Sequence, residues 1–233
     1  LKTISESFPN PREPSVSSSS HLWVLAHLDQ LHDNLRYKIR PLKAREMVEC
    51  KALHKEWFPI EYSDQFYASV GSSIHALAAV LEARDYDEMG WGSILVGLLL
   101  YRLESSESGF LRVTFLFSSN PAVYIVTLGV LTPLRKHGIA QAMISELHKV
   151  CSELYPRPVY MYLHVASYNS SAIRFYEAAG FKRHEELQDH YFIQGSRFAA
   201  YVYVLYMFDG KPPFLTLENL SWLFCQVTKF RNC

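Results

Sequence analysis

The chain has 233 residues, nearly half of them apolar and four of them tryptophan, and its 23 acidic and 23 basic side chains give a formal net charge of zero. This length suits one domain with extensions, and the apolar content is enough for a sizeable core. The balanced charge argues against a nucleic-acid-binding domain, which would carry a basic excess. Because the sequence has no run of about 18 apolar residues, it predicts no membrane-spanning helix.

The chain divides into three predicted parts. Residues 1–34 form an N-terminal extension rich in proline and serine, which we expect to be disordered apart from a short helix. Residues 35–210 form the folded domain. Residues 211–233 form a C-terminal amphipathic segment, which either docks on the domain or lies on a membrane surface. The apolar residues on one helical face of this segment are Leu220, Leu223, Phe224 and Val227.

The sequence of the domain predicts strands and helices in a mixed order. The expected elements are a strand over 37–40, a helix over 43–57, an aromatic loop over 57–62, a short helix capped by Ser63, strands over 74–82, 93–103 and 123–130, a helix to about Cys151, a strand over 158–165, a helix over 169–179 stopped by Gly180, a strand region from Phe181 and a strand over 198–208. Residues 111–117 could pair as one more strand, and the acidic link 83–92 receives no role. Together these elements predict an α+β domain.

The four cysteines are scattered along the chain at positions 50, 151, 225 and 233. Their spacing matches neither a metal site nor a disulfide framework, so we expect no metal and a reducing compartment.

The stretch from Val123 to Cys151 is a strand, a turn and an amphipathic helix. The first turn of a helix presents unpaired N–H groups and a partial positive charge, which suit a phosphate group. Arg135 and Lys136 add full charges in the turn, and Gly138 lets an anion approach the backbone. The alternative for this stretch alone is an ordinary strand-turn-helix with a solvated Arg-Lys pair.

Two motifs in this order resemble the GNAT acetyltransferase superfamily: Arg135-x-x-Gly138-x-Ala140, and Asn169-x-x-Ala172-x-x-Phe175-Tyr176-Glu177-x-x-Gly180-Phe181. The resemblance implies a mixed, mostly antiparallel sheet of about seven strands flanked by about four helices, with acetyl-CoA as the cosubstrate. It also implies that Asn169 binds the pantetheine arm and that Tyr176 directs its hydroxyl at the thiol. The residues expected to bind acetyl-CoA are Leu128, Gly129, Val130, Arg135, Lys136, His137, Gly138, Ile139, Ala140, Gln141, Asn169 and Tyr176.

Within the superfamily, residues 37–213 resemble the N-terminal acetyltransferases, most specifically in the loop Trp57-Phe58-Pro59-Ile60-Glu61-Tyr62. The resemblance implies a peptide substrate, with methionine at its N-terminus followed by an apolar residue or lysine. The residues expected to contact it are Phe58, Pro59, Glu61, Tyr62, Val126 and Tyr191. The chain departs from the family at Gln188-Asp189-His190-Tyr191-Phe192, where the family has consecutive tyrosines, so only Tyr191 carries over.

Acetyl transfer to an amine requires a general base, because the ammonium form cannot attack a thioester. By resemblance, Tyr124 and His164 lie on neighbouring strands and act together as this general base, through an ordered water. The ordinary pKa of histidine suits this role. The N–H groups around Leu128 to Val130 would receive the acetyl carbonyl. The remaining histidines and acidic residues are interpreted as surface residues.

The expected partners are protein N-terminal peptides, with no nucleic acid and no obligatory auxiliary subunit. By resemblance, the C-terminal segment places the protein peripherally on the cytoplasmic face of a membrane, either Golgi or plasma membrane. Two alternatives stay open: a lysine (histone) acetyltransferase, and a non-catalytic, membrane-tethered acyl-CoA-binding module.

Overall fold

The structure is a computed structural model that describes residues 36–81, 94–104, 122–154 and 160–207. The predictions for the N-terminal extension, the acidic link 83–92, the possible strand 111–117 and the C-terminal segment 211–233 lie outside these residues.

One seven-stranded sheet runs through the domain in the order β1-β2-β3-β4-β5-β7-β6. Its first half contains β1 (Tyr37–Pro41), β2 (His75–Leu81), β3 (Ile94–Glu104) and β4 (Ala122–Val130), which pair with one another in antiparallel fashion. Its second half contains β5 (Tyr160–Ala166), β6 (Lys182–Ile193) and β7 (Ser196–Tyr206), again antiparallel. The predicted α+β fold with a mostly antiparallel seven-stranded sheet is therefore confirmed.

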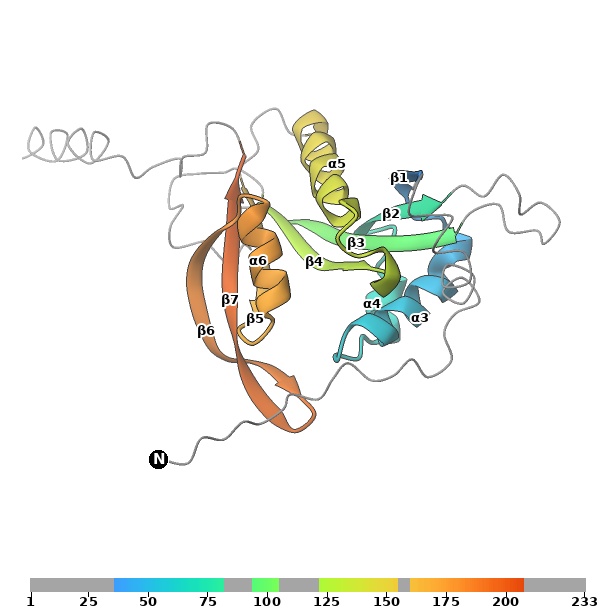
Figure 1. The fold of residues 1–233 in the computed structure, drawn as a ribbon. Coiled ribbons are helices and arrows are strands. Elements are labelled where there is room, and N and C mark those ends of the chain that lie inside the picture. Colours follow the sequence, from blue (N-terminus) through green and yellow to red (C-terminus); the bar gives the residue numbers. More distant parts are fainter. Residues whose placement is uncertain (1–35, 82–93, 105–121, 155–159, 208–233) are drawn as a thin grey trace, which may run out of the picture.

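The two halves of the sheet join at a short parallel contact between β4 and β5. Only three positions of β4 pair there, namely Ala122, Val123 and Tyr124, with Tyr160, Met161 and Tyr162. Beyond this contact the two strands separate, and the halves of the sheet diverge (Figure 1). The opening between β4 and β5 lies at the centre of the sheet.

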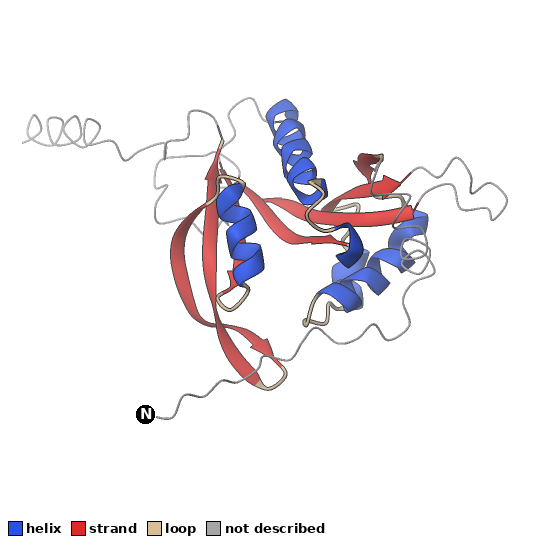
Figure 2. Ribbon diagram, in the orientation of Figure 1, coloured by secondary structure: helices blue, strands red, loops and turns tan. Residues whose placement is uncertain are grey.

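Helices cover the sheet near their predicted positions. The helical elements are η1 (Ala44–Glu46), α3 (Met47–Trp57), α4 (Asp64–Ala68), η3 (Thr132–Leu134), α5 (Ile139–Leu154) and α6 (Ser170–Ala178) (Figure 2). The expected helix 43–57 is divided into the short 3-10 helix η1 and α3, and α5 runs on to Leu154. The Ser63 hydroxyl accepts from the Phe66 N–H at the start of α4, as an N-cap does. Gly180 ends α6 with a φ of +91°, a conformation that glycine adopts at low cost.

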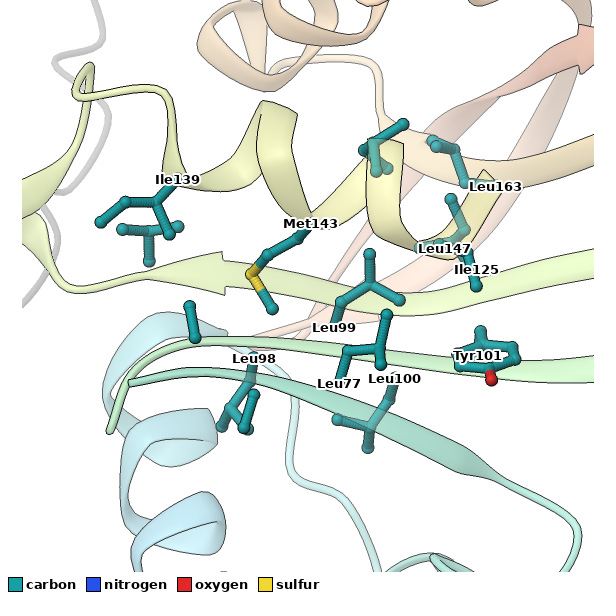
Figure 3. Packing of buried hydrophobic residues seen from close by; sticks show 14 of the residues in the cluster. Leu77, Leu98, Leu99, Leu100, Tyr101, Ile125, Ile139, Met143, Leu147 and Leu163 are labelled. Atoms are coloured by element: carbon teal, nitrogen blue, oxygen red, sulfur yellow. The ribbon is translucent and has the colours of Figure 1, made fainter. Parts of the chain in front are cut away.

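The core lies mainly between α5 and the first half of the sheet. Ile139, Met143 and Leu147 follow one another along the side of α5 that faces the strands, and all three are buried (Figure 3). Each such side chain contributes about 1.5–3 kcal/mol when fully buried. The helix α3 lies on the other side of these strands (Figure 3). In this way the core fixes α5 on one face of β4 and α3 on the opposite face.

Alternation along β4 and β5 sorts their side chains between the two faces of the sheet. Val123, Ile125 and Leu163 belong to the main core, with the α5 residues. Tyr160 and Tyr162 belong to a second, smaller cluster, against which Tyr124 packs. The side chains on the same face of the sheet as Tyr124 and Tyr162 therefore point away from α5. No helix among the described residues is both long and apolar enough to cross a membrane.

Candidate active site

The strand β4 is irregular where it leaves β5. Its pairing with β3 passes from Tyr101 opposite Ile125 directly to Leu100 opposite Thr127, which leaves Val126 without a counterpart. Bulges of this kind bend a strand and occur often beside active sites. From the bulge to Val130, the side of β4 that faces β5 has no partner strand among the described residues. Backbone N–H groups alternate between the two sides of a strand, so those of this stretch that point toward β5 can donate to a ligand, as the prediction for Leu128 to Val130 requires.

Tyr124 and His164 meet at the point where the two strands separate. His164 Nδ1 lies 3.0 Å from the Tyr124 hydroxyl oxygen, in a partly buried hydrogen bond. Burial is the main reason why the pKa of His164 falls to about 4, and the nearby His190 and Arg102 lower it further. Burial also raises the pKa of Tyr124, although Arg102 opposes this shift. At neutral pH the pair therefore consists of a neutral imidazole and a protonated phenol.

A charged group lies next to this pair, at the end of β3. The Arg102 guanidinium lies 4.9 Å from the centre of the Tyr124 ring and forms a 2.6 Å ion pair with Glu104. The Tyr162 hydroxyl donates a 2.5 Å hydrogen bond to the same carboxylate, and Glu104 is only 9% exposed. The expectation that the remaining acidic residues lie at the surface is therefore wrong for Glu104. The sequence signal was available, because Arg102 and Glu104 end an otherwise apolar strand.

The aromatic loop between α3 and α4 is attached to β4 through His54. The buried His54 ring lies 3.4 Å from the Tyr67 hydroxyl and 3.3 Å from the Thr127 hydroxyl, measured from its two nitrogens. Because both hydroxyls can donate or accept, a neutral ring satisfies both contacts. Desolvation lowers the pKa of His54 to about 4. The expectation that His54 lies at the surface is also wrong, since the packing of α3 on β4 buries it completely.

The substrate residues predicted in this loop differ in exposure. Phe58 and Tyr62 are half-buried, and both rings contact His54 with centroids 5.4 Å away. Pro59 and Glu61 are exposed. Tyr62 also stacks on Phe66 of α4 at 4.6 Å. The loop therefore presents a fixed aromatic surface, while Pro59 and Glu61 contribute only at its edge.

Tyrosine side chains from β6, α6 and the aromatic loop lie near the Tyr124 hydroxyl of the predicted catalytic pair. Tyr191 of β6 donates a 3.2 Å hydrogen bond to the His164 carbonyl. Burial raises the pKa of Tyr191, and the nearby Tyr124, Tyr62 and Tyr176 hydroxyls add to this shift. Burial raises the pKa of Tyr176 as well, with a further contribution from Tyr124. The structure thus brings together the predicted catalytic residues, the predicted thiol-facing Tyr176 and two predicted peptide contacts.

The turn before α5 has the geometry of an anion site. Lys136 and Gly138 both have left-handed backbones, with φ of +67° and +79°. The Arg135 Nε donates to the Val130 carbonyl at 3.1 Å, and the His137 imidazole donates to the Arg135 carbonyl at 2.9 Å. A side chain at position 138 would meet no atom within 4 Å, so the approach to the first turn of α5 is open. These residues fit the phosphate groups of acetyl-CoA.

Four of the residues predicted to bind acetyl-CoA lie at the start of α5 or of α6, namely Ile139, Ala140, Gln141 and Asn169. Ile139 is buried in the core, so only its backbone N–H can face a phosphate. Ala140 is half-buried and Gln141 is exposed, both in the first turn of α5. The side-chain oxygen of Asn169 accepts from the Ala172 N–H and caps α6, which leaves the amide nitrogen to bind a pantetheine arm.

Gly129 allows the Trp57 ring to pack closely on β4. A Cβ at this position would lie 2.2 Å from the Trp57 ring, so the indole packs directly on the backbone of β4. Leu128 is half-buried and Val130 is buried beside it. The indole lies on the α3 face of β4, and it holds this stretch of strand against the start of the aromatic loop.

A cavity of about 580 Å³ lies beside α4, and its lining does not include Tyr124 or His164. Phe66 and Arg102 border it, and these two residues contact Tyr62 and Tyr124, respectively. The cavity therefore adjoins the predicted peptide site on the side of β3. No group of three histidine, cysteine or acidic side chains able to hold a metal ion occurs in the part of the chain that the structure describes.

Comparison with known proteins gives a consistent result. The family model described as the acetyltransferase (GNAT) family matches residues 48–181. The N-alpha-acetyltransferase 60 of Xenopus tropicalis is 31% identical over 191 residues, covering 78% of this chain and 75% of that protein. The Arabidopsis thaliana protein named histone acetyltransferase MCC1 is 30% identical over 222 residues, covering 81% of this chain and 88% of that protein.

Solved structures agree with these relatives. The crystal structure of Arabidopsis thaliana NAA60 in complex with acetyl-CoA is similar with a TM-score of 0.66 at 29% identity, covering 74% of this chain and 99% of that chain. The same plant protein in complex with a bisubstrate analogue gives a TM-score of 0.67 at 30% identity, covering 76% of this chain and 100% of that chain.

Proposed function

The chain belongs to the acetyltransferase (GNAT) family, and from this premise we propose that it transfers the acetyl group of acetyl-CoA to the free α-amino group of protein N-termini. The observation that carries the proposal is the hydrogen-bonded pair of Tyr124 and His164, located where β4 and β5 separate. A neutral base at this position lies beside the unpaired side of β4. The relatives named N-alpha-acetyltransferase 60 support the same reaction.

The catalytic pair prepares the amine for attack. An α-amino group has an unperturbed pKa of about 8, so much of it is protonated at neutral pH. The neutral His164 imidazole, although its lowered pKa of about 4 makes it a weaker base than an ordinary histidine, accepts that proton through an ordered water, while the Tyr124 hydroxyl orients the water and the ring. The amine nitrogen then forms a bond to the acetyl carbon, and the bond from that carbon to sulfur breaks.

The backbone and a tyrosine handle the charges that develop as the bonds change. The N–H groups of β4 between the bulge and Val130 donate to the carbonyl oxygen as it gains negative charge. Tyr176 remains a protonated phenol, because its burial raises the pKa of the hydroxyl, so it can donate to the departing thiolate. The first turn of α5, with Arg135 and Lys136, binds the phosphate groups far from the reacting atoms.

Methionine followed by an apolar residue or lysine is the substrate sequence that we propose. The half-buried rings of Phe58 and Tyr62 offer an apolar surface to the methionine side chain, and Val126 at the bulge extends it. Tyr191 supplies a hydroxyl on the opposite side of the peptide. Residues further along the peptide enter the cavity beside α4.

A lysine acetyltransferase is the second candidate, and the relative named histone acetyltransferase MCC1 favours it. It ranks lower because a lysine amine, with an unperturbed pKa of about 10.4, is harder to deprotonate than an α-amine. A non-catalytic acyl-CoA-binding module is disfavoured, because Tyr124 and His164 form the hydrogen bond expected of two residues that act together as a general base.

Peripheral attachment to the cytoplasmic face of a Golgi or plasma membrane, through the amphipathic segment 211–233, is a further part of the proposal. The full chain would then sediment with vesicles of phosphatidylcholine and phosphatidylserine, and Leu223→Glu with Phe224→Glu would abolish the binding. We also propose that the enzyme acts without an auxiliary subunit, so the purified chain alone would be active.

The experiment that tests the reaction is acetyl transfer from acetyl-CoA to a panel of short peptides. The panel contains free Met-Leu, Met-Lys and Ser-Ala N-termini, together with an N-blocked peptide that has an internal lysine. We expect turnover of the two methionine peptides in preference to Ser-Ala and to the blocked peptide. Turnover of the blocked peptide alone would establish a lysine acetyltransferase, and no turnover of any peptide despite acetyl-CoA binding would leave a binding module.

A further inference from the structure

His190 lies directly on the predicted catalytic histidine. The two imidazole rings have centroids 4.6 Å apart and planes inclined by 24°, which is a stacked arrangement. The neighbouring Tyr191 contacts the His190 ring edge-on at 4.8 Å and donates to the His164 carbonyl. The side chain and backbone of His164 are thus held by consecutive residues of β6.

This contact is unusual for the topology of the sheet. Strand β7 lies between β5 and β6, so residues of β6 should be roughly 10 Å from β5, which is two strand spacings. The pairing of β6 with β7 jumps from Leu187 opposite Ala200 to Tyr191 opposite Phe198. Four steps along β6 therefore match two along β7, and the extra length forms a bulge.

The bulge in β6 allows the His190 side chain to reach past β7 to β5. Asp189 within it has a φ of +53°, a left-handed conformation that aspartate tolerates better than most residues. A bulge commonly re-aims a side chain toward a site. Here it places the exposed His190 of β6 on the face of the half-buried His164 ring of β5.

The surroundings of His164 define what His190 can contribute. Tyr124 of β4 bonds Nδ1 at the ring edge, and the ring of Tyr162 of β5 lies 6.0 Å away. Arg102 of β3 is the nearby cation that disfavours a charged imidazole, and His190 of β6 adds to this effect when it is protonated. The stack covers one face of the His164 ring with an exposed side chain, so it stands between that face and water.

We propose that His190 is a positioning residue for the acetyl transfer, whose ring holds the His164 imidazole against the Tyr124 hydroxyl and shields it from solvent. This role rests on the proposed function, in which His164 is the base. The contact depends on the bulge in β6, which brings His190 across β7 to the His164 ring.

The test compares His190→Ala, which removes the ring, with His190→Phe, which keeps a ring that cannot be protonated. His184→Ala is the matched control, because His184 is an exposed histidine on the same strand outside the site. The first measurement is the titration of the His164 imidazole by NMR in histidine-labelled full-length protein, with the resonance assigned through His164→Gln. The second is the dependence of kcat and of the peptide KM on pH.

Removal of the ring should raise the pKa of His164 by about one unit in His190→Ala, because the imidazole regains water and loses a neighbouring charge. His190→Phe should give a smaller rise, because only the charge is lost. The kcat should fall about tenfold in His190→Ala with little change in the peptide KM, and His190→Phe should recover most of that loss. His184→Ala should match wild type in every measurement.

Three results would overturn the role of His190. They are an unchanged His164 titration in His190→Ala, a loss of kcat in His190→Phe as large as that in His190→Ala, or a loss confined to the peptide KM, which would make His190 a substrate contact. Because the titration needs no substrate, it separates this inference from the proposed function. An enzyme that acetylates no peptide would refute the function, while the order of the three His164 pKa values would still decide the role of His190.

Discussion

The buried His54 makes the stability of the domain depend on pH in a way that one substitution can isolate. Its ring is fully buried between the Tyr67 and Thr127 hydroxyls, and its pKa falls to about 4. In the unfolded chain the same group titrates near its ordinary value of about 6.5. Between these two values the unfolded state binds a proton that the folded state excludes, so the free energy of unfolding decreases as the pH falls.

The size of this effect follows from the two pKa values. At pH 7.5 the group is neutral in both states and adds nothing to the difference. At pH 5 the unfolded state gains about 2 kcal/mol, from 1.5 pH units at about 1.36 kcal/mol each. The decrease begins near pH 6.5 and is complete near pH 4. Against a total stability of roughly 5–15 kcal/mol, this change is easily measured.

The assay is chemical denaturation of wild type and His54→Gln at pH 7.5 and at pH 5, with His184→Gln as an exposed control on β6. His54→Gln lowers stability at pH 7.5, but between the two pH values it should lose about 2 kcal/mol less than wild type does. Other histidines titrate equally in both proteins and cancel in this comparison. Equal losses in wild type and His54→Gln would refute the burial of a neutral histidine under the aromatic loop.

Three further predictions concern the strand, the turn and the loop. Gly129→Ala should destabilise the domain by about 1–3 kcal/mol in thermal unfolding, because its Cβ would overlap the Trp57 ring. In the background of Trp57→Leu, the same substitution should cause a smaller loss of stability. Arg135→Ala should weaken acetyl-CoA binding about tenfold in calorimetry and reduce its salt dependence, and an effect no larger than that of the exposed Arg197→Ala would contradict the phosphate site. Tyr62→Ala should raise the peptide KM severalfold and leave the acetyl-CoA KM unchanged, whereas equal changes in both would place Tyr62 outside the peptide site.

Local signals in the sequence were enough to predict most of the described fold. The Asn169 cap and Gly180 set the limits of α6, and the spacing of Ile139, Met143 and Leu147 predicted the buried face of α5. Boundaries moved by a few residues where no such signal exists. The last strand was expected over 198–208 and runs from Ser196 to Tyr206, because its start is set by the hairpin turn with β6 rather than by its own composition.

The proximity of Tyr124 and His164 was predicted from the family resemblance, which places them on neighbouring strands, and their hydrogen bond confirms that they meet. Contacts that depend on packing between distant elements could not be predicted. His54 is buried only when α3 packs on β4, and its bond to Thr127 joins residues 73 positions apart. His190 reaches His164 only because of the bulge in β6, which no periodicity signals.

The central claim is that the hydrogen-bonded pair of Tyr124 and His164 deprotonates the substrate amine. The most direct measurement is the single-turnover rate of acetyl transfer to the preferred peptide, across pH, for wild type, His164→Gln and Tyr124→Phe, with acetyl-CoA binding measured in parallel. The account predicts a rate loss of about 10²–10⁴-fold in His164→Gln and a smaller loss in Tyr124→Phe, with acetyl-CoA affinity preserved. In both variants the loss should shrink as the pH rises, because the amine then loses its proton without help. Rates equal to wild type in both variants, with the same pH dependence, would contradict it.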